Sequence, residues 1–343
     1  MGMKKCGASR PIFIRWLAAF AVTAAVAAAL PSPDSDVIDD LKRSLHVNDT
    51  YWNPTSERCE WPGILCDSTN SFVVHVDIPM YGFAGTLPEN LGKLTGLITF
   101  DASGNNITGA IPAFNGSVQL STLSLDRNRF TSIPDALFHS KPQLSFVSLD
   151  YNLLLPPWEL PEALANCSQL GYFSAINCNI RGPFPAFFKQ NSQLSVLRLA
   201  GNNLSGQLPF DLPVSLTTLS LGHQGGALSG SISGIQKLTN LIHLCLDGNT
   251  FSGEIPDLSH LIKLKEFVVS HNHLTGPVPE SISAIESSLT QVNLSNNHLS
   301  GVIPQTLAEF ALSGKLDVSN NNQLNGTIPS NLPNFPQPCD NVY

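Results

Sequence analysis

One sixteen-residue pattern returns along most of this chain and leaves little freedom for its fold. Its clearest copy, LSVLRLAGNNLSGQLP at residues 194–209, has the form L-x-x-L-x-L-x-x-N-x-L-S-G-x-L-P. Counted at its asparagine position, the pattern occurs eleven times, at intervals of 22 to 26 residues. The eleven positions are Tyr81, Asn105, Asn128, Asn152, Cys178, Asn202, Gln224, Asn249, Asn272, Asn297 and Asn321. A period of this length indicates an array of similar units, each stacked on the next.

Each position of the pattern has a physical reason. Side chains alternate along a strand, so Leu197 and Leu199 are expected to enter the core while Arg198 between them faces solvent. Asn202 then turns the chain inward, and its buried amide must bond to neighbouring backbone groups. One unit cannot bury its leucines alone, so the units share a continuous core. We therefore predict an α/β repeat fold, a right-handed leucine-rich-repeat solenoid of about eleven repeats with an N-terminal cap.

The two ends of the chain are expected to differ from the array. Residues 1–29 carry four basic side chains ahead of an apolar run that ends in alanines, which is typical of a secretory signal peptide. An uncleaved membrane anchor is the alternative, although the run is short for the roughly 20 apolar residues that a span needs. No span is expected in the mature chain. The predicted segments are a signal peptide at 1–29, a cap at 30–70, leucine-rich repeats at 71–329 and a C-terminal tail at 330–343.

The charge balance narrows the class of partner. The chain has 18 Lys and Arg against 26 Asp and Glu, and its first 29 residues hold four of the basic residues and none of the acidic ones. The mature chain is therefore expected to carry 14 basic against 26 acidic side chains, a net charge of −12. A chain this acidic argues against a nucleic-acid partner. Its charge favours a soluble protein with some preference for basic partners.

The predicted cap contains a helix and a disulfide. Apolar residues recur at helical spacing across 37–45, and either Asp34 or Ser35 can serve as the N-cap. In an oxidising compartment, Cys59 and Cys66, with a tryptophan between them, are predicted to form a disulfide. Cys167 and Cys178 are expected to be buried as small apolar side chains, with a bridge between them as the alternative. The pairing of Cys245 and Cys339 is left open.

Glycosylation signals fit a secreted chain. Seven N-x-S/T triplets are present, and N-linked glycans require this triplet. Asparagine-rich repeats also produce such triplets by chance, so we expect about half of them to be occupied. The candidate positions are Asn48, Asn106, Asn115, Asn166, Asn203, Asn293 and Asn325.

No motif in the sequence points to catalysis. The chain has no H-E-x-x-H, no G-x-S-x-G and no phosphate-binding P-loop, so we expect no enzymatic activity, no cofactor and no metal site. His223, His243 and His271 do not occupy one column of the repeat and are expected to be loose, solvated side chains. Two irregular stretches, Leu153–Trp158 and His223–Ala227, interrupt the pattern and are alternative binding loops.

Recognition by the concave face of the sheet is the favoured interpretation. Arginine and aromatic side chains on an extended surface are typical of recognition, although a merely solvated face explains the same residues equally well. We predict a ligand-binding lane in repeats three to eight. Its candidate residues are Asp126, Arg127, Asp150, Tyr151, Arg198 and Asp247.

The repeat tails and the cap together resemble a known family. S/T-G-x-I/L-P tails with a C-E-W-P-G-I-L-C cap resemble the plant-specific class of leucine-rich repeats, found in the extracellular domains of receptor-like kinases. Three further stretches resemble the transmembrane kinase (TMK) family within that class. They are WELPEAL at 158–164 followed by FSA at 173–175, GSISGIQKLTNL at 230–241, and IPDLSHLIKLKEF at 255–267.

The resemblance implies a function and also a departure from the family. Such receptors have further repeats, a membrane span and a cytoplasmic kinase, whereas this sequence has no Gly-rich nucleotide loop, no H-R-D and no D-F-G. The resemblance therefore implies a kinase-less, secreted recognition module of the apoplast or cell wall, or one held at the plasma-membrane surface by a partner. The expected partner is an extracellular protein, a peptide ligand or a receptor-kinase ectodomain, with auxin-related growth signalling as the associated process.

Two other classes of function are left open. The chain is similar in overall plan to the polygalacturonase-inhibiting proteins, which are secreted inhibitors of about ten repeats. Those proteins usually have a basic character and paired cysteines in a C-terminal cap, whereas this chain is acidic and Cys339 stands alone in its tail. A truncated product without a function is the third alternative.

Overall fold

The computed structural model describes residues 34–225 and 228–325. The chain divides into two units, 1–31 and 32–343, and all of the described residues belong to the second. The predicted signal peptide at 1–29 and the predicted tail at 330–343 lie outside the described residues. Among the residues that are described, no helix is long and apolar enough to span a membrane.

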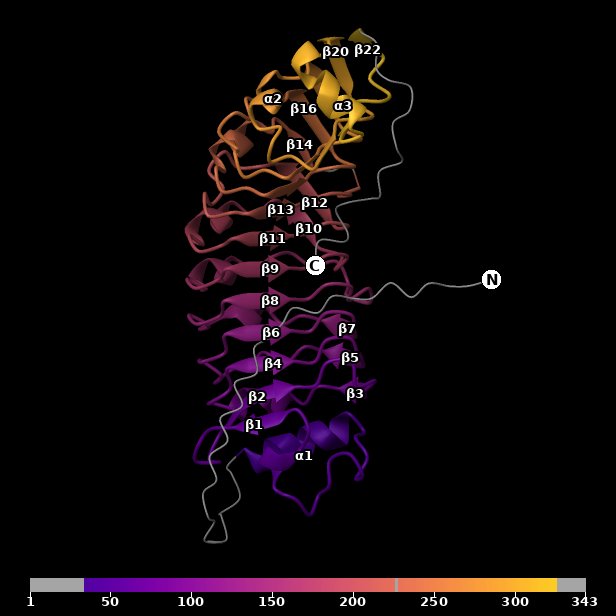
Figure 1. Ribbon diagram of the computed structural model, residues 1–343. Coiled ribbons are helices and arrows are strands. Elements are labelled where there is room, and N and C mark those ends of the chain that lie inside the picture. The colour runs from indigo at the N-terminus through magenta and orange to yellow at the C-terminus, as the bar shows by residue number, and fades with distance from the viewer. Residues whose placement is uncertain (1–33, 226–227, 326–343) are drawn as a thin grey trace, which may run out of the picture. The chain divides into compact units, whose positions relative to one another are not determined.

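The second unit is built on one long sheet whose strands follow the chain from repeat to repeat (Figure 1). Strand β1 pairs antiparallel with β2, and every later strand of the sheet is parallel to its neighbours. Equivalent positions of successive repeats lie side by side in neighbouring strands, so that Leu197 stands between Phe173 and Leu219. The strands of this sheet, in order, are β1 (Ile64–Cys66), β2 (Val73–Asp77), β4 (Thr99–Asp101), β6 (Thr122–Ser124), β8 (Phe146–Ser148), β9 (Tyr172–Ser174), β11 (Val196–Arg198), β13 (Thr218–Ser220), β15 (His243–Cys245), β17 (Glu266–Val268), β19 (Gln291–Asn293) and β21 (Leu316–Asp317).

Two smaller parallel sheets follow the second extended segment of each repeat. They are separated at repeat four, where the irregular stretch Leu153–Trp158 leaves a single bridge between Trp158 and Ile180. The first sheet contains β3 (Ala84–Thr86), β5 (Asn106–Ala110) and β7 (Arg129–Ser132). The second contains β10 (Arg181–Pro183), β12 (Asn203–Gln207), β14 (Leu228–Gly230), β16 (Thr250–Glu254), β18 (His273–Gly276), β20 (His298–Val302) and β22 (Gln323–Asn325).

Short helical turns complete the repeats and close the core. Apart from η1, each 3₁₀ turn buries one or two apolar side chains, such as Leu91 or Phe188, in the continuous hydrophobic core that runs through the unit. The 3₁₀ turns are η1 (Arg58–Glu60), η2 (Glu89–Lys93), η3 (Asp135–Phe138), η4 (Glu162–Asn166), η5 (Ala186–Gln190), η6 (Ser233–Lys237) and η7 (Gln305–Leu307). The α-helices are α1 (Ser35–Ser44), α2 (Ser281–Ala284) and α3 (Ala308–Leu312). The predicted leucine-rich-repeat solenoid is thus confirmed.

A ladder of buried side-chain amides fixes each repeat to its neighbour. Asn202 is 2% exposed, and its Nδ2 donates to the carbonyl oxygens of Ala175 at 2.7 Å and Leu199 at 2.8 Å. Its Oδ1 accepts from the backbone N–H groups of Cys178 at 3.0 Å and Ile180 at 2.9 Å. The amide therefore satisfies backbone groups of the preceding repeat as well as its own. We call the side chain at this position the ladder residue.

At two positions inside the array another residue replaces the ladder asparagine, and each keeps part of this hydrogen bonding. The Cys178 thiol donates to the Leu149 carbonyl oxygen at 3.0 Å, which is a weaker bond than an amide makes. Gln224 keeps the amide on a longer side chain, and its Nε2 donates to the Leu199 carbonyl at 2.6 Å. In the first repeat, Tyr81 instead packs against Tyr51 of the cap, with 5.3 Å between ring centroids.

The cap closes the first repeat as predicted. Helix α1 packs Ile38 and Leu41 fully buried, and it begins after Asp34. The Asp34 carboxylate does not cap this helix; it accepts instead from the N–H of Val73 at 2.7 Å, which ties the helix to strand β2.

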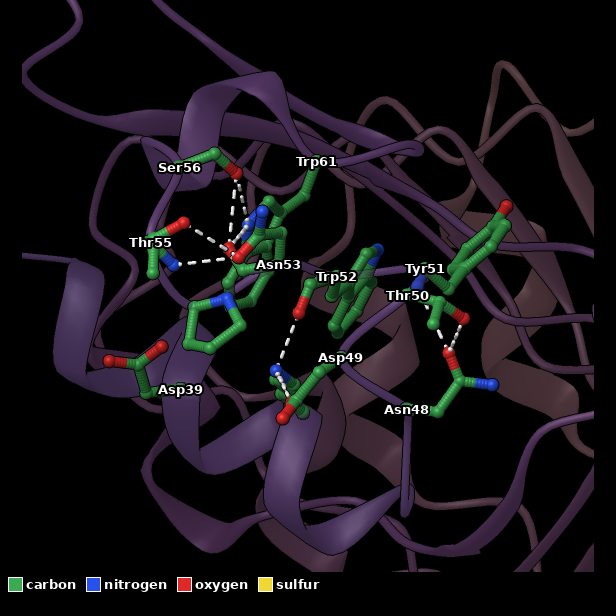
Figure 2. Close-up of polar contacts among 12 residues, drawn as sticks. Asp39, Asn48, Asp49, Thr50, Tyr51, Trp52, Asn53, Thr55, Ser56 and Trp61 are labelled. Atoms are coloured by element: carbon green, nitrogen blue, oxygen red, sulfur yellow. Dashed lines mark hydrogen bonds and ion pairs between the residues drawn. The ribbon is translucent and has the colours of Figure 1, made fainter.

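Two tryptophans of the cap are stacked and hydrogen bonded (Figure 2). The Trp52 and Trp61 rings stack with centroids 5.1 Å apart, and the Trp61 indole N–H donates to the carbonyl of Asn53 at 2.8 Å. The predicted bridge between Cys59 and Cys66 is present beside them.

Two predictions about single side chains have different outcomes. Cys167 and Cys178 are buried and free, so the alternative of a bridge between them is wrong. The expectation that Arg198 faces solvent is also wrong, since Arg198 is only 6% exposed. Its side chain does stand opposite the leucines, but side chains on the flanking strands of a sheet lie about 4.8 Å away and can cover it.

The ladder makes a testable prediction about stability. Asn202→Ala removes one side chain and leaves several buried backbone groups without a partner, so we expect the free energy of unfolding to fall by about 3 kcal/mol or more. Gln193→Ala, at an exposed position of the same repeat, is expected to change it by less than about 0.5 kcal/mol. Thermal melts of the two variants measure this difference, and equal shifts would contradict the ladder's role.

Candidate functional site

The candidate residues lie on the side of the twelve-stranded sheet opposite the leucines, which we call the sheet surface. Asp126, Asp150 and Asp247 all stand two residues before a ladder residue, and they therefore share a column, as predicted. Arg127 and Tyr151 share the next column. The placement of Arg198 in this lane was wrong: it lies four residues before its ladder residue and pairs with Ser174 and Ser220.

The column of Arg127 and Tyr151 has an unusual backbone. Every described residue immediately before a ladder position has a positive φ between 53° and 68°. Non-glycine residues rarely adopt this left-handed conformation, because the Cβ atom crowds the following carbonyl. The residues are Met80, Gly104, Arg127, Tyr151, Asn177, Gly201, His223, Gly248, His271, Asn296 and Asn320. This turn ends the strand segment and sets these side chains along one edge of the sheet surface.

Arg127 and Tyr151 are in contact along this edge. The Arg127 guanidinium lies over the Tyr151 ring, 5.3 Å from its centroid. Such a cation–π contact holds both side chains in place at a modest gain in energy. Arg127 is exposed and Tyr151 is half-buried, so both can still touch a ligand.

A second aromatic pair, which the sequence analysis missed, lies on the neighbouring part of the sheet surface. Phe146 of β8 and Tyr172 of β9 stack with their rings 4.3 Å apart and 13° from parallel. Both residues stand six positions before a ladder residue. Alignment of the repeats by column could have found the pair, because the two aromatic residues occupy one column in successive repeats. Both rings are half-buried and present a flat apolar area.

Two aspartates of the lane are held by hydroxyl and backbone donors. Asp150 accepts from the Ser174 hydroxyl at 2.7 Å and from the Ile176 N–H at 2.6 Å. Burial raises the pKa of Asp150, although these bonds and the nearby positive charge of Arg198 oppose the shift. Burial likewise raises the pKa of Asp126, which accepts from the Ser124 hydroxyl at 3.0 Å. Both carboxylates are thus built into the surface rather than free on it.

Arg198 has a different environment. No hydrogen-bond partner for its Nε is present among the described residues. The hydroxyl of Ser220, which is paired with Arg198 on the next strand, is also buried and lacks a partner there. Two buried polar groups on neighbouring strands therefore have unused hydrogen-bonding capacity, which is uncommon in folded proteins.

Two of the histidines of repeats seven to nine are paired, which corrects the expectation that they are loose. His223 Nε2 lies 2.8 Å from Asp247 Oδ2, and His243 Nδ1 lies 2.9 Å from Glu266 Oε2. Each pair joins two consecutive repeats. Asp247, only 4% exposed, is therefore already engaged by His223 and is less available to a ligand than predicted.

The irregular stretches and the glycosylation triplets are partly described. Leu153 and Leu154 are 70% and 57% exposed, and the Trp158 indole N–H donates to the Cys178 carbonyl at 2.7 Å. The stretch at 223–227 lies partly outside the described residues. Within the described part of the chain, no three His, Cys, Asp or Glu side chains are grouped to hold a metal. The triplet asparagines at 48, 106, 115, 166, 203 and 325 are exposed, and that at 293 is half-buried.

Comparison with known proteins agrees with this geometry. A model of the family Leucine Rich Repeat matches residues 193–214, 263–285 and 288–310. Receptor-like kinase TMK2 of Arabidopsis thaliana is 39% identical over 227 residues, which are 64% of this chain and 25% of TMK2. This chain therefore spans only about a quarter of the length of that relative.

Solved structures give the same fold. The ectodomain of the Arabidopsis receptor kinase HAESA, in complex with an extended IDA peptide hormone ligand, matches with a TM-score of 0.64 and 27% identity, over 84% of this chain and 52% of that one. A plant ice-binding protein matches with a TM-score of 0.70 over 86% of this chain and 95% of that one, but at 21% identity it shows the fold alone. The chain is a leucine-rich-repeat solenoid similar to the ectodomains of plant receptor kinases.

The raised pKa of Asp150 predicts how its contribution depends on pH. The folded protein binds the Asp150 proton more tightly than the unfolded chain does, so the carboxyl group stabilises the fold most at acid pH. This contribution is lost as the pH rises from 3.8, the ordinary value, through the folded-state pKa. Asp150→Asn keeps an oxygen acceptor but does not ionise. We expect the wild type to lose stability relative to this variant between acid and neutral pH.

Urea unfolding at pH 4 and pH 7 measures the difference between the two proteins. Asp211→Asn removes one carboxylate from an exposed position and serves as the control. If the wild type instead gains stability relative to Asp150→Asn as the pH rises, the folded protein favours the ionised carboxylate and the prediction is wrong.

Proposed function

We propose that this chain is an extracellular recognition module that binds a peptide or protein ligand across the sheet surface of repeats three to eight. The observation that carries the proposal is the pair of aromatic contacts there, Arg127 on Tyr151 and Phe146 on Tyr172. Aromatic and arginine side chains contribute most of the energy of measured interfaces, and here they are held rigid before a ligand arrives. The proposal assigns no catalytic role to any residue.

The comparisons support this class of function. HAESA, a receptor kinase of similar fold, was solved with a peptide hormone bound to its leucine-rich-repeat ectodomain. Secretion of this chain fits its basic and apolar N-terminus and its seven N-x-S/T triplets. The Cys59–Cys66 bridge also fits an oxidising compartment. The resemblance to TMK-type receptors makes auxin-related growth signalling the process in which we would look for the ligand.

A binding experiment with an edge variant tests the proposal. The secreted protein is selected against a library of random displayed peptides, and the affinity of each captured peptide is measured for wild type and for Arg127→Gly/Tyr151→Gly. Glycine already occupies this column at 104, 201 and 248, so the double variant removes both side chains without forcing the backbone. We expect at least about a 30-fold loss of affinity, since one anchor is worth about 2 kcal/mol or more.

The matched control is Arg181→Gly, which removes an exposed arginine from β10, outside the sheet surface. It is expected to bind as the wild type does. If the double variant keeps its peptides as tightly as wild type, the lane is not the binding surface, and the exposed stretch Leu153–Trp158 becomes the better candidate.

A further inference from the structure

Two histidines of consecutive repeats lie side by side on the seven-stranded sheet, and we call them the histidine pair. His273 begins β18 and His298 begins β20, and each directly follows the ladder residue of its repeat. Their rings are 6° from parallel, with 5.4 Å between centroids. Both side chains are exposed. The histidine pair is therefore accessible, and it lies outside the sheet surface, which belongs to the twelve-stranded sheet.

The ladder fixes the backbone beneath the histidine pair. Asn297 Oδ1 accepts from the N–H of Leu274 at 3.0 Å, and Asn297 Nδ2 donates to the carbonyl oxygen of Val269 at 3.0 Å. The first of these bonds joins the residue after His273 to the residue before His298. Strands β18 and β20 also pair in parallel. The fold, rather than the exposed side chains themselves, therefore sets the spacing between the two histidines.

The ring nitrogens of the histidine pair are not used by the fold. Other histidines of these repeats are engaged: His223 and His243 each face a carboxylate, and His271 Nε2 lies 3.3 Å from the Asn296 amide nitrogen. Among the described residues, no hydrogen-bond or ion-pair partner contacts a ring nitrogen of the histidine pair. A neutral imidazole carries one nitrogen with a free lone pair, and this nitrogen is a common metal ligand.

We infer that the histidine pair binds a divalent first-row transition ion such as Zn²⁺ or Cu²⁺. Imidazole suits these ions, whereas Mg²⁺ and Ca²⁺ select oxygen ligands. An ion about 2.0–2.1 Å from one nitrogen of each ring lies roughly 3 Å from each ring centroid. A tetrahedral angle at the ion then places the centroids about 5 Å apart, close to the 5.4 Å in the structure. Rotation of the exposed side chains turns one nitrogen of each ring toward the ion.

The site is open and connects two repeats. Two protein ligands leave the other coordination positions to water or to a group of a partner. Because each strand supplies one ligand, the bound ion links β18 to β20 and stabilises the folded repeats. No metal-ligand spacing is visible in the sequence, since a full repeat separates the two histidines. The inference goes beyond the proposed function and does not depend on it.

Calorimetric titration with ZnCl₂ tests the site in the full secreted chain, purified without a histidine tag and freed of metal by a chelator. We expect His273→Gln and His298→Gln each to weaken Zn²⁺ binding at least about 10-fold, since loss of an outer-shell partner alone costs that much. The double variant is expected to lose the site, and MgCl₂ is expected not to bind there. Glutamine is used because asparagine at either position would create an N-x-S/T triplet. In thermal melts, Zn²⁺ is expected to raise the Tm of the wild type but not that of the double variant.

The matched control is His260→Gln, which removes an exposed histidine that lies between β16 and β17 and is expected to keep the wild-type affinity. Electron paramagnetic resonance with one equivalent of Cu²⁺ is expected to show coupling to two imidazole nitrogens in the wild type and to one in each single variant. If the double variant binds Zn²⁺ as tightly as the wild type, or if the control weakens binding as much as either pair variant, the ion binds to scattered histidines and the inference is wrong. A wild type that binds neither Zn²⁺ nor Cu²⁺ also overturns it. None of these outcomes bears on the proposed function, which peptide selection tests separately.

Discussion

The bond on which this structure depends is the one from the ladder amide to the repeat before it. A repeat of about 24 residues cannot bury its own leucines, and the chain turns inward only where the buried backbone groups of that turn find partners. Asn202 supplies them from one side chain, since it donates to Ala175 and accepts from Ile180 in the preceding repeat. Strand pairing, core packing and the position of the surface residues all follow from this connection.

The ladder also explains the shape of the candidate site. The residue before each ladder position must take a left-handed conformation, and glycine would be the least costly choice there. Arg127 and Tyr151 occupy that position nevertheless, and each pays a conformational cost of about 1 kcal/mol or more. The ladder bonds hold the turn regardless, so large side chains can be placed along the edge of the sheet surface. A repeat fold thereby separates the residues that maintain the turn from those that are free to recognise a ligand.

The fold could be predicted from sequence because its signals are local and repeated. Three signals each indicate one structure: the period of the leucines, the ladder asparagines and the paired cysteines of the cap. How deeply a surface side chain is buried has no such local signal. Alternation along the strand correctly placed Arg198 opposite the leucines. Its burial, however, depends on side chains of the preceding and following repeats, about 24 residues away in the sequence. The same holds for His223 and His243, whose partners Asp247 and Glu266 come from the next repeat. Such contacts become visible in sequence only when the repeats are aligned by column, as the pair Phe146 and Tyr172 shows.

The acidity of the chain acts differently at long range and at the sheet surface. A net charge of −8 acts over long distances, where it is screened by salt and affects mainly how fast a charged ligand approaches. At the sheet surface, Asp126 and Asp150 are held by hydroxyl groups and shifted toward their neutral forms by burial, so their local repulsion is reduced. The aspartates of the lane thus mainly hold the sheet surface together, and under the proposed function the exposed Arg127 and the half-buried aromatic rings are the groups left to contact a ligand.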